Sequence, residues 1–226
     1  MGERAYDVVV WGATGFTGNL ICQHLALHAP PTLKWIAAGR REAALKKVCA
    51  ELPVGACPPS GVLVGDADDA VAAARIAKSC RLVLAAAGPF AKFSATILKA
   101  CANNGTHYVD ITGEAIPYVS ESVRTHDAVA RKSGAKLVHC CGYDSVPSDL
   151  LTLLAIEALR EHGQATTHVT VGFDLLRTVG TMSGGTLHTI CAIMAYLSST
   201  PTAIPDALNP FSLCTPQPEQ QFFPTR

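Results

Sequence analysis

Three glycines follow the first apolar run of the sequence at a spacing that suits a phosphate-binding loop. Residues 6–11 form that short run, and it leads directly into the seven residues GATGFTG. In such a loop the first glycine permits a tight turn off a strand, the second lets the backbone approach a pyrophosphate, and the third lets the next helix pack on the sheet. The start of that helix offers free N–H groups and a positive dipole end to a phosphate. The residues that we predict to bind a dinucleotide here are Gly12, Thr14, Gly15, Phe16, Thr17 and Gly18. The alternative is a glycine-rich turn with a purely structural role.

The second apolar run ends in a pair of arginines rather than in an acid. A site for NAD places Asp or Glu about 20 residues after the glycine loop, where it holds the ribose 2′-hydroxyl. Here residues 34–38 lead into Gly39, Arg40 and Arg41, and the first acid, Glu42, begins the next helix. A guanidinium group pairs with a 2′-phosphate and stacks on adenine, so Arg40 and Arg41 favour NADP over NAD. The alternative is a solvated helix start.

Two later loops complete the predicted cofactor site. Asp66 follows the apolar run 61–64 and can either face the adenine amino group or belong to the start of the next helix. Ala87, Gly88 and Pro89 follow the run 82–86. Ligands of parallel sheets bind beyond the carboxyl ends of the strands, so we expect this backbone to run beside the nicotinamide half of the cofactor.

These loops need a parallel sheet to bring them together. Short apolar runs alternate with helical stretches between residues 6 and 161, which is typical of βαβ units. The expected strands are residues 6–11, 34–38, 61–64, 82–86, 108–111 and 136–139. The expected helices are residues 18–28, 42–52, 68 or 69 to 80, 92–103, 117–132 and 147–161. We therefore predict an α/β fold, a Rossmann-type doubly wound parallel sheet, with residues 1–162 as the NADP-binding domain.

The pattern changes after residue 162. Residues 167–176 predict a longer strand, and Ser183-Gly184-Gly185-Thr186 introduces a helix to about residue 198. Six of the 14 prolines lie beyond residue 200, a density with which we expect neither a helix nor a central strand. We predict that residues 163–226 are the start of an α+β second domain, for substrate binding or dimerisation, with a Pro-rich tail.

A reduction by hydride transfer also needs a proton donor near the developing anion. The candidates lie at the ends of the fifth and sixth expected strands and in the loops that follow, and they are Tyr108, Asp110, Glu114, His139, Tyr143, Asp144 and Ser145. We predict Tyr143 and Asp144 as the catalytic pair. In the structural alternative, Asp144 or Ser145 caps the helix that Pro147 opens and Tyr143 packs at a domain interface. Asp110 and Glu114 have an alternative role in forming the turn around Gly113.

Composition and spacing exclude several other classes of protein. Lys plus Arg and Asp plus Glu number 18 each, so the chain lacks the basic surface of a protein that binds nucleic acid. No stretch approaches the roughly 20 apolar residues of a transmembrane helix. The nine cysteines show no C-x-x-C spacing and the eight histidines no H-E-x-x-H spacing, so we predict no metal site. We expect reduced, mostly buried cysteines in an intracellular, cytoplasmic protein.

Six motifs occur in the order that is found in one enzyme family. They are GATGFTG at 12–18, AGR at 38–40, AGPF at 87–90, YVDITGE at 108–114, GYDSVPSD at 142–149 and SGGT at 183–186. The chain resembles the saccharopine dehydrogenase-like oxidoreductases, which include trans-acting enoyl reductases of lipid biosynthesis, over about residues 5–190. The resemblance implies an NADP-type Rossmann domain joined to an α+β domain. It also implies association with lipid droplets, mitochondria or a membrane surface. Members of the family are nearly twice this length, so we expect a shortened chain whose second domain is incomplete.

Taken together, the residues and the resemblance predict an NADP-dependent oxidoreductase. Its substrate would be a small-molecule or lipid-like enoyl or carbonyl compound, and a second copy of the chain in a homodimer is a further expected partner. The alternative is an NADP(H)-binding module or scaffold at lipid surfaces that performs no turnover.

Overall fold

A six-stranded parallel sheet forms the centre of the molecule. The computed structural model describes residues 4–55, 57–172, 183–209 and 211–214. The strands are β1 (Tyr6–Trp11), β2 (Trp35–Gly39), β3 (Val62–Val64), β4 (Cys80–Ala85), β5 (His107–Asp110) and β6 (Leu137–Val138). They lie in the order β3-β2-β1-β4-β5-β6, and every neighbouring pair is parallel. This arrangement confirms the predicted doubly wound α/β sheet. The strand order reverses between β1 and β4, which opens a crevice at their carboxyl ends.

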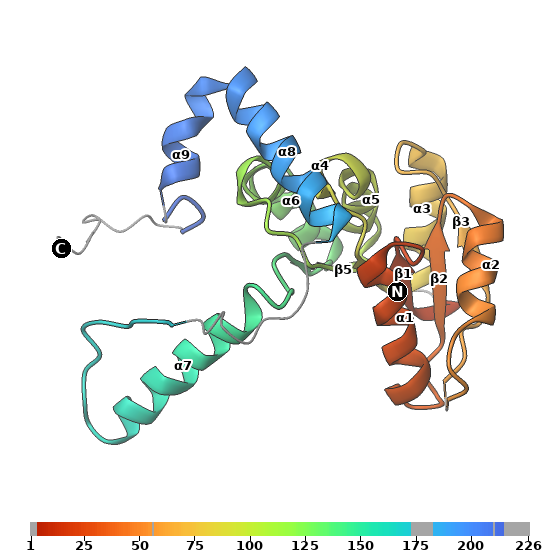
Figure 1. Ribbon diagram of the computed structural model, residues 1–226, viewed down its shortest axis with the longest axis horizontal. Helices are drawn as coiled ribbons and strands as arrows, with labels where there is room; N and C mark the ends of the chain where they lie inside the picture. The colour runs from red at the N-terminus through yellow and green to blue at the C-terminus, as the bar shows by residue number, and fades with distance from the viewer. Residues whose placement is uncertain (1–3, 56, 173–182, 210, 215–226) are drawn as a thin grey trace.

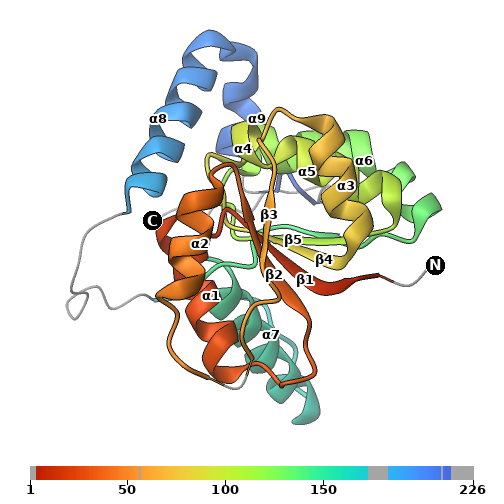
Figure 2. The same cartoon turned by 90° about the vertical axis from the view of Figure 1, so that its right-hand side faces the viewer.

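Helices cover both faces of the sheet (Figures 1 and 2). The helices α1 (Phe16–His28) and α2 (Glu42–Ala50) lie on one face. The helices α3 (Ala70–Ser79), α5 (Ala95–Asn104) and α6 (Ser120–Ser133) lie on the other. Because side chains alternate along a strand, Val10 of β1 packs with Cys22 and Leu45 on one face, while Val9 packs with Ile76 and Ile97 on the other. The continuous apolar runs of the strands therefore serve two cores.

Several helix ends follow from single residues. The Asp69 side chain accepts hydrogen bonds from the backbone N–H groups of Val71 and Ala72, both at 2.9 Å, and so caps α3. Gly105 and Gly134 end α5 and α6 with φ angles of +66° and +79°, in the left-handed region that glycine adopts without steric cost. These stops agree with the predicted helix ends.

Two expected helices are each divided. The helix predicted over residues 92–103 consists of α4 (Phe90–Phe93) and α5, which meet at Ser94. The buried Ser94 hydroxyl donates to the carbonyl oxygen of Ala87 at 3.0 Å, and this tertiary contact holds the break. The helix predicted over residues 117–132 begins within a short segment, η1 (Ala115–Val119), and continues as α6.

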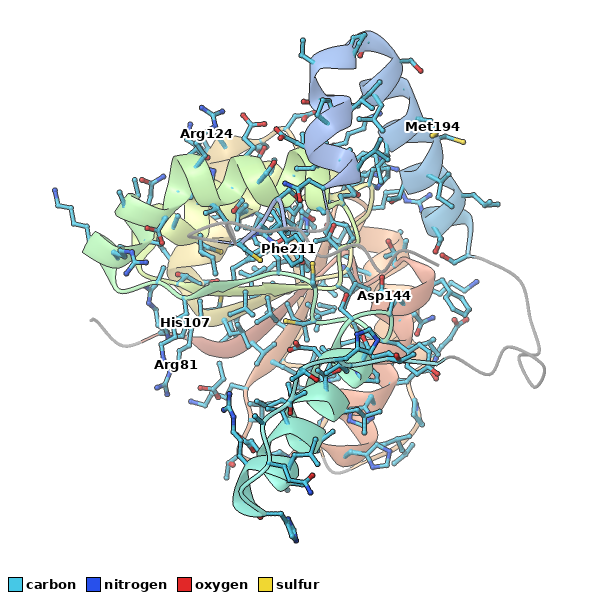
Figure 3. All side chains as sticks on the ribbon, turned by 90° about the vertical axis from the view of Figure 1, so that its left-hand side faces the viewer. Arg81, His107, Arg124, Asp144, Met194 and Phe211 are labelled. Atoms are coloured by element: carbon cyan, nitrogen blue, oxygen red, sulfur yellow. The ribbon has the colours of Figure 1, made fainter. Side chains whose placement is uncertain are left out.

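The last third of the described chain extends from the sheet. It contains α7 (Val146–Glu161), α8 (Gly184–Ser199), the 3₁₀ turn η3 (Pro201–Ala203) and α9 (Ile204–Leu208). Figure 1 shows α7 projecting away from the sheet, and neither α7 nor α8 contains a buried residue. In Figure 3 Met194 points outward from α8, and 62% of its surface is exposed. No helix within the described ranges is long and apolar enough to cross a membrane.

Two predictions for this region need correction. The proline density does not prevent helix formation after residue 200, because Pro201 and Pro205 lie in the first turns of η3 and α9, where a missing N–H group costs nothing. The strand predicted over residues 167–176 is wrong for residues 167–172, which form no strand. Residues 173–176 lie outside the described residues. The boundary between residues 162 and 163 stays a prediction.

Candidate cofactor-binding site

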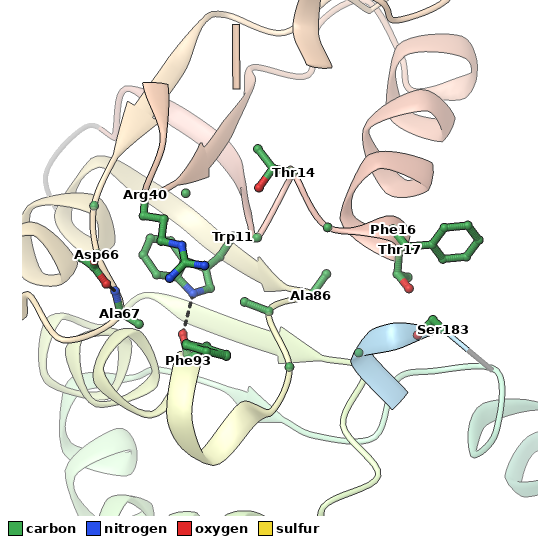
Figure 4. A pocket seen from close by; sticks show the side chains of 17 residues that line it. Trp11, Thr14, Phe16, Thr17, Arg40, Asp66, Ala67, Ala86, Phe93 and Ser183 are labelled. Atoms are coloured by element: carbon green, nitrogen blue, oxygen red, sulfur yellow. Dashed lines mark hydrogen bonds between the residues drawn. The ribbon is translucent and has the colours of Figure 1, made fainter. Parts of the chain in front are cut away.

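A cleft lies at the carboxyl ends of the central strands (Figure 4). Its lining includes most of the residues predicted to bind the cofactor, namely Gly12, Thr14, Gly15, Phe16, Thr17, Arg40, Asp66, Ala87 and Gly88. Gly18, Arg41 and Pro89 stand next to this lining in the sequence but are not part of it. The sheet thus brings together four loops that are up to about 75 residues apart, as expected for the carboxyl ends of parallel strands.

The glycine loop fits closely against its neighbours. Gly12 has a φ of +85°, and a Cβ there would lie 2.9 Å from the Ala87 nitrogen. A Cβ on Gly18 would lie 2.1 Å from the Gly12 carbonyl oxygen, so Gly18 brings α1 against the loop rather than facing the cleft. Helix α1 begins at Phe16, with Gly15 before it as the N-cap residue. The first-turn N–H groups of a helix have no intrahelical acceptor, and this end of the cleft therefore suits an anion.

Arg40 lies at the other end of the cleft, beside two aromatic side chains. Its guanidinium carbon is 5.9 Å from the ring centroid of Phe93. The Trp11 indole N–H donates to the carbonyl oxygen of Phe93 at 2.9 Å, which joins β1 to α4. Figure 4 shows Arg40, Trp11 and Phe93 close together, with Ser183 at the opposite end. A cation and aromatic rings in this arrangement suit a phosphorylated adenosine.

Asp66 and Arg41 have local roles. Asp66 lines the cleft, and its carboxylate accepts a hydrogen bond from the Ala67 nitrogen at 2.6 Å. It therefore shapes the turn before α3, while Asp69 caps that helix. Arg41 is the N-cap residue of α2. Of the two arginines, Arg40 is the one that the fold directs into the cleft.

Helix α8 contributes a wall that the sequence did not assign to the site. Ser183 and Gly185 line the cleft, and the Ser183 hydroxyl caps α8 by accepting from the Thr186 nitrogen at 3.1 Å. The signal was the SGGT motif, which marked a helix start but gave no distance to the glycine loop. Trp11 and Phe93 were also missed from the sequence. Trp11 ends the predicted strand 6–11 and Phe93 lies near the start of the predicted helix 92–103, so both were interpreted only as apolar residues of these elements.

The predicted catalytic pair lies outside this lining. Tyr143 is 89% exposed, and Asp144 is exposed in the segment that leads into α7 (Figure 3). Ser145 is the N-cap residue of α7, but no side-chain hydrogen bond caps that helix. The capping role that we considered for Asp144 or Ser145 is therefore wrong. A catalytic role for Tyr143 and Asp144 stays a prediction.

Three other candidates, Tyr108, Asp110 and His139, lie in or next to β5 and β6 and contact Tyr118 of η1 and Ser122 of α6. We call these five residues the strand-end cluster. The Tyr108 and Tyr118 hydroxyl groups are 2.9 Å apart. Burial raises the pKa of both hydroxyl groups well above its ordinary value. The contact between the two hydroxyl groups joins β5 to η1.

Comparison with known proteins agrees with this geometry. Residues 8–138 match the family model for the saccharopine dehydrogenase NADP binding domain. A trans-acting enoyl reductase of Mycobacterium tuberculosis is 34% identical over 217 residues, which cover 94% of this chain and 50% of that protein. The trans-acting enoyl reductase of Mycobacterium leprae is 33% identical over 216 residues, with the same shares covered. The chain therefore spans about half the length of these curated relatives.

The fold also has a match among solved structures. Apo saccharopine dehydrogenase (L-Glu forming) from Saccharomyces cerevisiae aligns with a TM-score of 0.56 at 19% identity, over 70% of this chain and 32% of that one. This likeness shows a shared fold. The family model, which matches more than half of the chain, identifies it as a member of the saccharopine dehydrogenase-like family, with an NADP-binding domain over residues 8–138.

Proposed function

We propose that this chain is the NADP-binding part of an oxidoreductase that reduces an enoyl or carbonyl substrate of lipid-like character. The observation that carries the proposal is the cleft in which Arg40 and the first turn of α1 lie at opposite ends of one site. The relatives named trans-acting enoyl reductase support the class of reaction. The exposed leucines of α7, among them Leu151 and Leu154, support an apolar substrate or an association with a lipid droplet or a membrane surface, while an association with mitochondria rests on the family resemblance alone.

Each part of the cleft has a task in this proposal. The N–H groups at the start of α1 bind the pyrophosphate, with the hydroxyl groups of Thr14 and Thr17 as further donors. Arg40 pairs with the 2′-phosphate and stacks on the adenine. The backbone at Ala87 and Gly88 lies beside the nicotinamide, which supplies the hydride when bound.

The substrate receives a hydride at one carbon and a proton at its partner atom. We keep Tyr143 and Asp144 as the proposed proton donors. Their positions outside the cleft lining favour one rival function, an NADP(H)-binding module that performs no turnover. A homodimer stays a prediction.

Calorimetric titration of the chain with NADPH and NADH tests the cofactor proposal. We expect NADPH to bind at least about tenfold more tightly, because a charge-assisted contact to the 2′-phosphate is worth more than 1 kcal/mol. Absence of NADPH binding contradicts both the oxidoreductase and the binding module. Oxidation of NADPH in the presence of an α,β-unsaturated acyl thioester supports the oxidoreductase. Tight binding without oxidation of NADPH by any enoyl or carbonyl compound supports the binding module.

A further inference from the structure

Glu114 is a buried carboxylate that joins three elements around the cleft without lining it. Only 2% of its surface is exposed. Its Oε1 accepts a hydrogen bond from the Phe90 nitrogen at 2.6 Å, and its Oε2 accepts one from the Ala91 nitrogen at 3.0 Å. The Thr189 hydroxyl of α8 donates to Oε1 at 3.3 Å. One side chain at the start of η1 thus holds the beginning of α4 and the middle of α8.

Both held elements form walls of the cleft. Phe90 and Ala91 come directly after residues 86–89, of which Ala86, Ala87 and Gly88 line the cleft. Helix α8 supplies Ser183 and Gly185 on another side. The two walls also meet directly, because a Cβ on Gly88 would lie 3.5 Å from the Thr189 hydroxyl oxygen. A change at Glu114 should therefore move the wall after β4 and the wall formed by α8 together.

The carboxylate is itself held in place. The Glu114 nitrogen donates to the Thr112 hydroxyl at 3.0 Å, and the Thr112 nitrogen donates to Asp110 Oδ1 at 3.1 Å. A buried carboxylate is stable only when its oxygens are hydrogen-bonded, and here donors from two other elements meet that need. A series of hydrogen bonds behind a side chain holds that side chain in the geometry that its function needs.

We propose that Glu114 is a positioning residue for the nicotinamide half of the cofactor. It sets the backbone at residues 86–88 and docks α8 against it, while the adenosine half depends on Arg40 at the other end of the cleft. The inference rests on the proposed function, since it takes the cleft as the site of NADPH.

Two probes separate the two halves of the cleft. NADPH occupies the whole cleft in this proposal, whereas adenosine 2′,5′-bisphosphate carries the adenosine and its phosphates but no nicotinamide, and so makes no use of the wall at residues 86–88. Glu114→Gln replaces one accepting oxygen with an amide N–H₂ group, which cannot accept from the Phe90 or Ala91 nitrogen. We expect this variant to bind NADPH about tenfold more weakly, the loss that corresponds to one charge-assisted hydrogen bond. Its affinity for the bisphosphate should stay within about twofold of the wild type.

A second variant and a control guard against a general loss of stability. Thr189→Val removes only the contact to α8, and it should weaken NADPH binding by a smaller factor and leave bisphosphate binding unchanged. Thr106→Val removes a buried hydrogen bond to the Ala77 carbonyl oxygen, 2.6 Å long, at the opposite end of β5. It should lower thermal stability while both ligands bind as in the wild type. If Glu114→Gln does not fold, Thr189→Val decides the question.

The outcomes are distinguishable. Equal losses for both ligands in Glu114→Gln, or unchanged NADPH binding in a folded Glu114→Gln or in Thr189→Val, overturn the positioning role and leave the proposed function standing. Failure of the wild-type chain to bind NADPH contradicts the proposed function instead.

Discussion

His139 Nδ1 lies 2.7 Å from Oδ2 of the fully buried Asp110 carboxylate. On its other side, His139 Nε2 lies 2.8 Å from the Ser122 hydroxyl. The second oxygen of Asp110 accepts hydrogen bonds from the Thr112 and Cys140 nitrogens. These contacts join β5, the end of β6 and α6, and β6 itself contributes only two residues to the sheet.

Asp110→Asn should therefore lower the free energy of unfolding by about 3 kcal/mol, because removing one partner leaves buried donors unpaired. Equilibrium urea denaturation measures this loss. Asp127→Asn is the control, since Asp127 pairs with Arg131 on the exposed surface of α6 and such pairs contribute little. Equal stability of the two variants would show that the strand-end cluster does not hold β6 in place.

Arg40→Glu should weaken NADPH binding by roughly tenfold to a hundredfold and NADH binding far less, because only NADPH offers a 2′-phosphate to the guanidinium. Titration calorimetry with both nucleotides measures the ratio. Arg124→Glu makes the same change of charge on the exposed face of α6 and should leave the ratio unchanged. Arg41→Glu should have an effect between these two. An equal loss for both nucleotides in Arg40→Glu would remove the assignment of Arg40 to the 2′-phosphate.

Gly18→Ala should destabilise the fold by about 3 kcal/mol and abolish NADPH binding. The new Cβ would lie 2.1 Å from the Gly12 oxygen and 2.8 Å from the Gly12 carbonyl carbon, so α1 or the loop must move. Thermal unfolding with and without NADPH measures both effects. Gly172→Ala is the control, because a Cβ there meets nothing within 4 Å. Wild-type stability in Gly18→Ala would contradict the close packing of α1 on the loop.

Alkaline pH should weaken the fold through its buried thiols. Burial raises the pKa of the Cys22 and Cys80 thiols from 9.0 to about 12. The unfolded chain releases these protons at lower pH than the folded protein. The contribution of the buried thiols to stability is therefore complete below about pH 9 and falls as the pH rises toward 12, by up to about 1.4 kcal/mol per thiol and pH unit.

Denaturation midpoints measured across this pH range test the expectation. Cys22→Ala should flatten the decline. Cys214→Ala should not, because Cys214 is exposed, as are Cys141 and Cys191. Four of the nine cysteines are buried, which corrects the expectation that the cysteines are mostly buried. An unchanged slope in Cys22→Ala would contradict a protonated, buried thiol at that position.

The sequence was informative where a feature depends on neighbours in the chain. The glycine loop, a helix start at residue 68 or 69 and the helix ends before Gly105 and Gly134 are local features, so spacing alone predicts them. The break at Ser94 and the role of Glu114 depend on partners that the fold brings from elsewhere, and Thr189 lies 75 residues from Glu114. Residue type marked Glu114 as an acid of interest, but it gave no sign that backbone nitrogens of α4 and a hydroxyl of α8 would surround it.

The contribution of α8 to the cleft has a consequence for how the protein responds to its ligand. A helix without buried residues has little packing of its own to hold it against the sheet. A ligand that touches both Gly185 and the glycine loop adds its binding free energy to that docking, about 2.7 kcal/mol at a hundredfold excess over its dissociation constant. A higher concentration of NADPH would then lower the rate at which a protease cleaves α8.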